Sequence, residues 1–165
     1  MEMETLKDLY VDGLKDLWSA EKQIIKGLER MTKAASHPEL KKAFENHAAM
    51  TEKHVERLEK ICADLEVSPR GKKCVGMEGL IDEAKELIGE KPDPDVLDAG
   101  LIAAAQNVEH YEMAGYGCAR TYARQLGFNE QADLLQTTLD EEGSTDKLLT
   151  QIAETSINIQ AERAD

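Results

Sequence analysis

Apolar residues recur every three or four positions over long stretches of this sequence, and proline or glycine separates one stretch from the next. The first stretch keeps this spacing from Leu6 to Met31, which indicates one buried face of an α-helix. Leu, Ala, Glu and Lys are abundant while aromatic residues make up only 4% of the chain, a composition that favours long helices. The sequence therefore predicts an all-α protein.

Breaks in this pattern place the helix boundaries. Pro38 and Pro94 each suit the first turn of a helix, where no helical hydrogen bond is lost, and Gly127 suits a helix end. A loop at residues 68–71 and a break at residues 91–93 set a shorter helix apart in the middle. We expect one domain over residues 1–165, with helices at about residues 5–35, 38–66, 75–90, 94–126 and 129–160.

The order of these helices predicts a topology. The breaks after the first and fourth helices are short, so each neighbouring pair is expected to form an antiparallel hairpin. The middle helix must then cross from one hairpin to the other. Two hairpins joined by one long crossover form a ferritin-like four-helix bundle, here with an extra short crossover helix.

The charge and the composition exclude several classes of protein. A net charge of −13 argues against nucleic-acid binding and against anionic membrane surfaces, because affinity for a polyanion comes largely from Lys and Arg. No apolar run approaches the ~20 residues needed to span a bilayer, and the first ten residues lack a signal-peptide pattern, so we expect a cytoplasmic protein. Cys62, Cys74 and Cys118 lack zinc-site spacing and are expected to be reduced, packing cysteines.

Acids and a histidine interrupt the apolar faces at a few positions. A carboxylate that faces a bundle core is costly unless it is paired or bound to a metal. Counting from the two hairpin turns puts such side chains from all four long helices at a common depth, within ~3 Å at a rise of ~1.5 Å per residue. The candidate metal ligands are Glu21, His54, Glu109, Glu112, Glu142 and Asp146.

An oxygen-rich site with one or two imidazoles is typical of iron or manganese, because hard carboxylates neutralise and bridge such ions. We therefore expect two metal ions, with iron as the first choice and manganese as the alternative. Two divalent ions would offset several buried negative charges.

Each of these residues also has a simpler interpretation. A single inward Glu more often lies at the edge of the apolar face with its carboxylate in water. His47 is expected to be a core histidine with its hydrogen bonds satisfied, and packing is the first interpretation of Tyr111 and Tyr116. His110 and Glu141 point away from the apolar faces and are expected to be solvated.

Three segments of the sequence resemble one family of proteins. SAEKQ at residues 19–23, KCVGMEGL at residues 73–80 and LIAAAQNVEHYE at residues 101–112 resemble the YciF/YciE family of bacterial stress-induced proteins, and the similarity covers nearly the whole chain. That family is ferritin-like, forms dimers and is similar in structure to rubrerythrin-type di-iron proteins. The resemblance implies a homodimer. It also implies that the residues matching the di-iron carboxylates are Glu21, Glu109, Glu112 and Glu142.

The second helix departs from the family pattern. The family usually has Glu-Thr-x-x-His or Glu-Thr-x-x-Gln there, and this sequence has Met50 in place of the Glu, four residues before His54. Because a thioether is a poor ligand for a hard ion, one metal position is expected to be weak or to rely on His47 instead. Asp146 stands where rubrerythrins tend to have a histidine.

These observations support a di-metal redox protein that reacts with peroxide or oxygen. The alternative, which Met50 favours, is a non-enzymatic stress dimer with a degenerate metal site that acts through protein contacts. An iron-storage shell is a weaker third hypothesis, because no segment is identifiable as a cage contact. The sequence has no rubredoxin-like Cys pairs, so an electron donor is expected to be a separate molecule.

Overall fold

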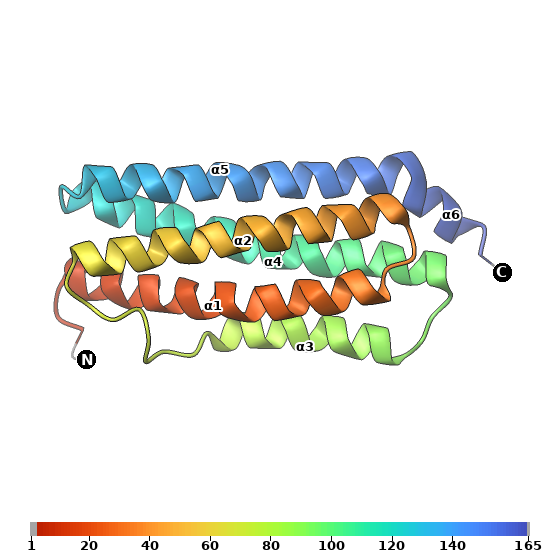
Figure 1. Ribbon diagram of the computed structural model, residues 1–165, viewed down its shortest axis with the longest axis horizontal. Helices are drawn as coiled ribbons and strands as arrows, with labels where there is room; N and C mark the ends of the chain where they lie inside the picture. Colours follow the sequence, from red (N-terminus) through yellow and green to blue (C-terminus); the bar gives the residue numbers. More distant parts are fainter. Residues whose placement is uncertain (1–2, 165) are drawn as a thin grey trace.

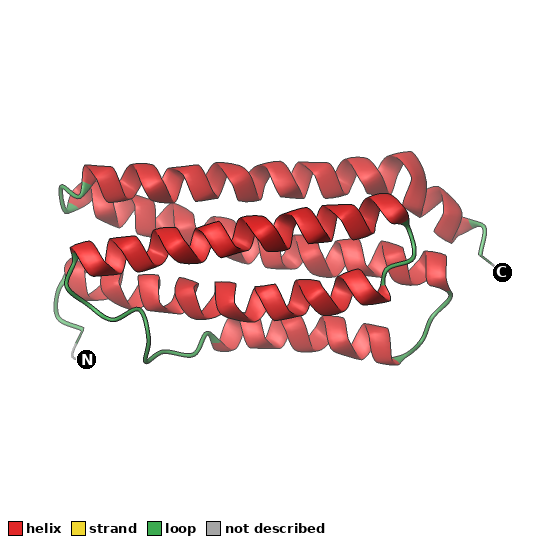
Figure 2. Cartoon of the chain, in the orientation of Figure 1, coloured by secondary structure: helices red, strands yellow, loops and turns green. Residues whose placement is uncertain are grey.

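The computed structural model describes residues 3–164, which are almost entirely helical and contain no strand (Figure 2). The all-α expectation is confirmed. The long helices are α1 (Leu6–Ala34), α2 (Pro38–Asp64), α3 (Val75–Gly89), α4 (Pro94–Gln125) and α5 (Asn129–Ile152). A π-helical turn, η1 (Ala153–Ile157), and the short α6 (Asn158–Glu162) follow, so the stretch expected as one helix at 129–160 is interrupted, and α6 leaves the direction of α5 (Figure 1).

The four longest helices form a bundle of two antiparallel hairpins (Figure 1). α1 packs on α2 and α4 packs on α5, while contacts of α1 with α4 and of α2 with α5 join the two hairpins. The connection between the hairpins contains α3, which lies against α1 and α4 on the outside of the bundle. This is the predicted topology with its crossover helix. No helix in the described part of the chain is long and apolar enough to cross a membrane.

Polar contacts fix the ends of the helices. Thr5 and Asp8 form a capping box at the start of α1, in which the Thr5 hydroxyl accepts from the Asp8 N–H at 3.1 Å and the Asp8 carboxylate accepts from the Thr5 N–H at 2.9 Å. The buried Asp98 of α4 accepts hydrogen bonds from the backbone N–H groups of Ser36 and His37, both at 2.8 Å. Asp98 is therefore a structural acid that holds the α1–α2 turn against α4.

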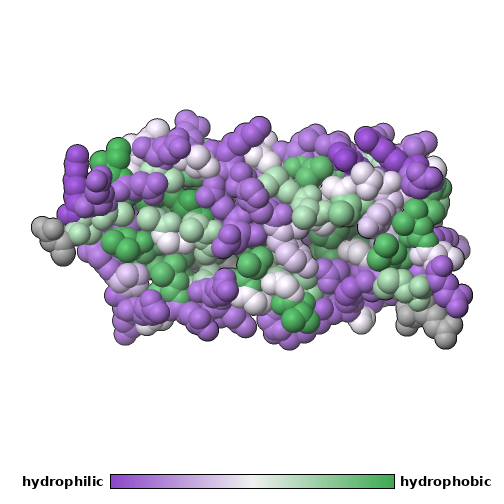
Figure 3. Space-filling model, turned by 180° about the vertical axis from the view of Figure 1, so that it is seen from behind, coloured by the Kyte–Doolittle hydropathy of each residue, from purple (hydrophilic) through white to green (hydrophobic). Residues whose placement is uncertain are grey.

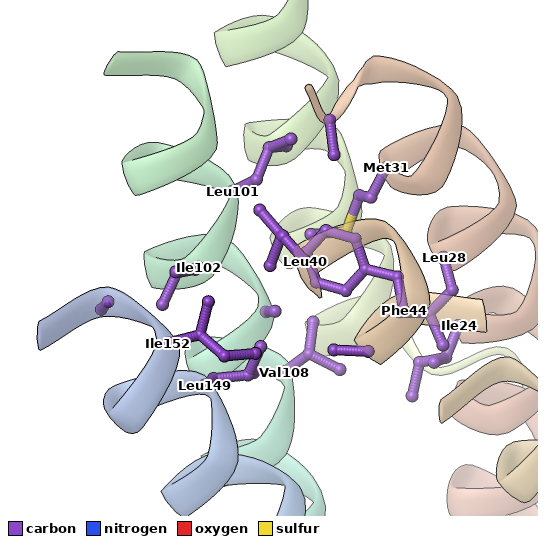
Figure 4. Packing of buried hydrophobic residues seen from close by; sticks show 14 of the residues in the cluster. Ile24, Leu28, Met31, Leu40, Phe44, Leu101, Ile102, Val108, Leu149 and Ile152 are labelled. Carbon is purple, nitrogen blue, oxygen red and sulfur yellow. The ribbon is translucent and has the colours of Figure 1, made fainter. Parts of the chain in front are cut away.

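The apolar core consists of two clusters with a layer of buried polar residues between them. The first cluster lies toward the α1–α2 turn and includes Ile24, Leu28, Met31, Leu40, Phe44, Leu101, Ile102, Val108, Leu149 and Ile152 (Figure 4). The second lies toward the α4–α5 turn and includes Tyr10, Leu14, Leu17, Leu58, Ile61, Tyr116 and Leu135. The polar layer is thus closed off by packed side chains at both ends.

Cys74 and Tyr111 fix the start of the crossover helix. The Cys74 Sγ accepts from the Met77 N–H at 3.4 Å and lies 3.0 Å from the Tyr111 hydroxyl, which donates to Asp16 at 2.9 Å. Gly76 passes so close to this ring that a Cβ on it would lie 2.7 Å from a Tyr111 ring carbon. A larger residue at position 76 would therefore have to move a ring that two hydrogen bonds hold in place.

We expect Gly76→Ala to destabilise the protein by ~1–3 kcal/mol through overpacking against Tyr111. Gly79→Ala is the matched control, because a Cβ at that position meets nothing within 4 Å. It should raise the stability by up to ~1 kcal/mol, since alanine favours a helix interior over glycine. Urea unfolding followed by circular dichroism measures both. Equal effects of the two substitutions would contradict a fixed Tyr111 ring.

Candidate metal centre

Six side chains from the four bundle helices meet in the polar layer. α1 supplies Glu21, α2 supplies both histidines, α4 supplies a Glu pair one turn apart, and α5 supplies one Glu. None of the six is more than 3% exposed to solvent. They are Glu21, His47, His54, Glu109, Glu112 and Glu142.

The six residues form two groups that share two carboxylates. In the first group, Glu21 and His54 lie with Glu112 and Glu142, and one ligand atom from each lies within 4.8 Å of the others. In the second group, His47 and Glu109 lie with the same two shared acids, within the same limit. Each group therefore offers one carboxylate and one imidazole of its own, together with two carboxylates that could bridge.

The inner ring nitrogen of each histidine faces these acids. His54 Nδ1 lies 2.8 Å from Glu142 Oε1 and 3.4 Å from Glu21 Oε1. His47 Nε2 lies 3.0 Å from Glu109 Oε1 and 3.6 Å from Glu142 Oε2. The two histidine rings, on one face of α2, have centroids 6.4 Å apart.

Most of the buried polar atoms in this layer lack a well-aligned hydrogen bond, although the inner histidine nitrogens lie close to carboxylate oxygens. Both carboxylate oxygens of Glu112 and of Glu142, one oxygen each of Glu21 and Glu109, and the inner nitrogens of both histidines make no well-aligned hydrogen bond within residues 3–164. Buried polar atoms are normally paired, and a buried carboxylate without partners is especially costly. Unpartnered oxygens and nitrogens that converge on one volume are what a cation site requires.

Burial shifts the protonation of the cluster. It raises the pKa of Glu142 to about 8 and that of Glu109 to about 7, and burial next to the Glu21 and Glu142 charges raises the pKa of Glu112 well above its usual value. Burial alone would lower the pKa of His54, but its contacts with Glu142 and Glu21 outweigh that effect and raise it to about 10. Burial lowers the pKa of His47. Without metal, protons therefore neutralise much of the charge, and a bound cation would displace them.

A tyrosine and an acid–arginine pair surround the cluster. The Tyr116 hydroxyl donates to Glu21, and its ring centroid lies 6.3 Å from that of His54. On the other side, the outer nitrogen of His54, Nε2, lies 2.9 Å from Glu141 Oε2. Arg57 donates to both Glu141 oxygens, at 2.5 and 3.0 Å, and it lowers the pKa of that carboxyl.

Comparison with known proteins identifies the family. The family model described as Domain of unknown function (DUF892) matches residues 5–162. The chain is 43% identical over 163 residues to Protein YciF of Escherichia coli, and the match covers 98% of each chain. This chain belongs to the YciF family.

Three solved structures have the same fold. The crystal structure of the E. coli stress protein YciF matches with a TM-score of 0.91, at 43% identity over 94% of this chain and 99% of that one. YcfI from Rhodopseudomonas palustris matches with a TM-score of 0.88, at 39% identity over 90% of this chain and 95% of that one. A Xanthomonas campestris protein at 21% identity has a TM-score of 0.79 and shows the shared fold alone.

Five of the six residues expected as ligands from the sequence lie in the cluster, and Asp146 does not. Its carboxylate is about one-fifth exposed and lies 3.2 Å from His110 Nε2 on α4. Position 146 is rotated by about 40° from Glu142 around the helix axis, which turns it toward the outer edge of the α4–α5 contact. His110 is exposed, as expected.

His47 completes the second group in place of Asp146. It lies in the core, as expected, but its Nε2 makes no well-aligned hydrogen bond among the described residues. Its distance of seven residues from His54 was the available signal, since seven residues bring two side chains within about 20° of each other around a helix. Glu141, expected to be solvated, is half-buried and contacts His54.

Met50 lies beside the cluster rather than in it. It is half-buried and lines a surface groove with Glu141 and Thr145 of α5, whereas the next residue, Thr51, is fully buried between the two histidines. Position 50 is about 60° from His47 around the helix axis. The cluster has four acids and two histidines without a side chain from position 50.

We expect the metal-free protein to lose stability between about pH 5 and pH 8. Over this range the folded state binds more protons than the unfolded state, because the pKa values of Glu109 and Glu142 are about 7 and about 8 when folded and 4.5 when unfolded. His54 acts in the same direction, because its stabilisation is complete below pH 6.5 and is lost as the pH rises through about 10.

Denaturant unfolding in the presence of chelator, at steps from pH 5 to pH 9, measures this loss. The Glu142→Gln variant should have a flatter profile, with a difference of at least ~1 kcal/mol across the range. A parallel profile for wild type and variant would contradict the proton-loaded cluster.

Proposed function

We propose that this protein holds two divalent metal ions in the polar layer, with iron as the first choice and manganese as the alternative, and that it reacts with peroxide or oxygen. The observation that carries the proposal is the set of unpartnered, fully buried carboxylate oxygens and imidazole nitrogens that converge from four helices. The relationship to a protein described as a stress protein supports a role in the stress response.

The charges of the cluster fit two divalent cations. Glu21, Glu109, Glu112 and Glu142 carry four negative charges when ionised, and both histidines can bind a metal as neutral ligands. Two divalent ions would bring the net charge of this dry interior to zero, which removes the main cost of burying it. The residues present thus fit the pair of ions that the family resemblance implies.

The chain would give each ion a similar set of ligands. Glu21 with His54 would hold one ion and Glu109 with His47 the other, and Glu112 and Glu142, which belong to both groups, would contribute to both positions. Two redox-active ions supply the electrons needed to reduce peroxide or oxygen. Tyr116 holds Glu21 in place through a hydrogen bond, and the two apolar clusters limit access of bulk water.

A non-enzymatic dimer with a degenerate site is the alternative to this proposal. The feature that favoured it was Met50, and Met50 lies outside a cluster that has four acids and two histidines without it. Cys62, Cys74 and Cys118 are free and lack the CxxC spacing of a rubredoxin-like pair. We therefore propose a separate electron donor.

Glu109→Ala and Glu142→Ala should each abolish binding of at least one ion and any associated peroxide consumption. The stability of the metal-free protein should stay level or rise, because each substitution relieves the burial of a carboxylate that folding does not need. Asp146→Ala is the control and should retain both ions. Metal quantification on protein purified without chelator, together with thermal melts of the metal-free and loaded forms, measures these effects. If both Glu variants kept the wild-type metal content, the di-metal assignment would be wrong.

We also propose that the protein is a homodimer, as the family resemblance implies. The apolar side of α3 packs on α1 and α4 of the same chain. An apolar groove remains where α3 leaves the α1–α4 seam uncovered, lined by Tyr10, Gly13, Leu17, Tyr111, Ala114, Gly115 and Cys118 among others. Asp16 is the sole charged residue of this lining, so two acidic chains could meet there with little repulsion. Figure 3 shows apolar patches among hydrophilic residues on one face of the molecule.

Ala114→Glu should convert the dimer into a monomer, because it places a charge in this groove on both subunits. Ala49→Glu, on an exposed position of α2, is the matched control and should leave the dimer intact. Light scattering coupled to size exclusion measures the mass. A wild-type monomer or a shell of 12 to 24 subunits would contradict the proposal.

A further inference from the structure

Each histidine of the cluster contacts α5 through its outer ring nitrogen. His54 Nε2 lies 2.9 Å from the Glu141 carboxylate, while its Nδ1 faces the cluster. His47 Nδ1 lies 3.4 Å from the Thr145 hydroxyl oxygen, while its Nε2 faces the cluster. Glu141 and Thr145 are one turn apart on α5, and we call these two residues the outer acceptors.

The outer acceptors differ in strength and in how firmly they are held. The Glu141 carboxylate is anchored by two guanidinium N–H groups of Arg57, one on each oxygen, and Arg57 also donates to Thr138 at 3.0 Å. The Thr145 hydroxyl donates its proton to the Glu141 backbone carbonyl at 3.1 Å. Its oxygen can therefore act only as an acceptor toward His47, and that distance is longer, 3.4 Å. A charged acceptor at 2.9 Å forms a much stronger hydrogen bond than a neutral hydroxyl at 3.4 Å.

We infer that Glu141, anchored by Arg57, is a positioning residue that fixes the His54 ring for the metal position on the Glu21 side, and that the two metal positions are unequal as a result. An outer carboxylate keeps the proton on Nε2, leaves the Nδ1 lone pair directed at the cluster and makes the imidazole a better donor to a metal. His47 has only a hydroxyl in that role. The inference rests on the proposed function, since it concerns the order in which the proposed ions bind.

A purely structural role for Glu141 predicts something different. The Arg57–Glu141 pair is between one-fifth and one-third exposed, and an ion pair at such a depth contributes little to folding. A structural role would change the melting temperature of the metal-free protein and leave the relative affinity of the two metal positions unchanged. A positioning role changes that relative affinity.

The experiment is a calorimetric titration of the metal-free, full-length protein with Co(II) and, under anaerobic conditions, with Fe(II). Wild type should show two binding steps. Glu141→Ala should weaken the tighter step by about 10- to 100-fold and leave the weaker step within about threefold. Glu141→Gln, which retains an oxygen acceptor without the charge, should fall between wild type and Glu141→Ala. Asp140→Asn removes an exposed charge from the same turn of α5 and should change neither step.

A second readout reports on the histidine directly. In the Co(II)-loaded protein the outer N–H of a bound imidazole gives a shifted, exchangeable proton NMR signal, and Glu141→Ala should speed the exchange of one such signal with water while Thr145→Val affects the other. Circular dichroism establishes that each variant is folded. Two unchanged binding steps in Glu141→Ala, or an equal loss in both, would overturn the inference while leaving the di-metal proposal intact. A wild-type protein that binds no ion would overturn the proposed function and the inference with it.

Discussion

The burial of four carboxylates in the middle of a helical bundle is the constraint on which the rest of this structure depends. Glu21, Glu109, Glu112 and Glu142 are at most 1% exposed, and no Lys or Arg of the described chain pairs with them. Such an arrangement is costly to fold, because each charge loses its water and repels its neighbours. Protons offset this cost in the metal-free protein, so folding and protonation depend on the same few residues.

The two apolar clusters on either side of the polar layer stabilise the fold, and their burial offsets the cost of burying the acids. Every bundle helix contributes to both clusters, so each helix is packed above and below the point where it presents a ligand. Packed elements of this kind hold side chains more precisely than loops do. The crossover helix packs beside the first cluster, where Cys74, Tyr111 and Gly76 fix its start. The fold is therefore arranged to keep the acids in place even though they weaken it.

The α2–α5 contact adds an outer layer to the centre. His47 and His54 point their inner nitrogens at the acids, and α5 provides the groups that hold the outer nitrogens. α5 thus contributes Glu142 to the cluster and, from the adjacent edge of the same helix, Glu141 and Thr145 to its support. Outer contacts of this kind orient an imidazole ring, and here they differ between the two histidines.

The sequence by itself determined the helical class, the two hairpins and the depth of the acids, because the spacing of apolar residues defines a helix face and a rigid helix converts residue number into height. Residues at the centre of a face, such as Glu112 and Glu142, were predictable for this reason. Residues at the edges of a face were not, and only the tertiary structure decided that Asp146 and Met50 lie outside the cluster and that Glu141 supports it. At the edge of a helix face, a rotation of about 40–60° around the helix axis moves a side chain from the bundle interior to the outside of the helix contact. Which neighbour the side chain meets there depends on how two helices pack, and neither helix determines it alone.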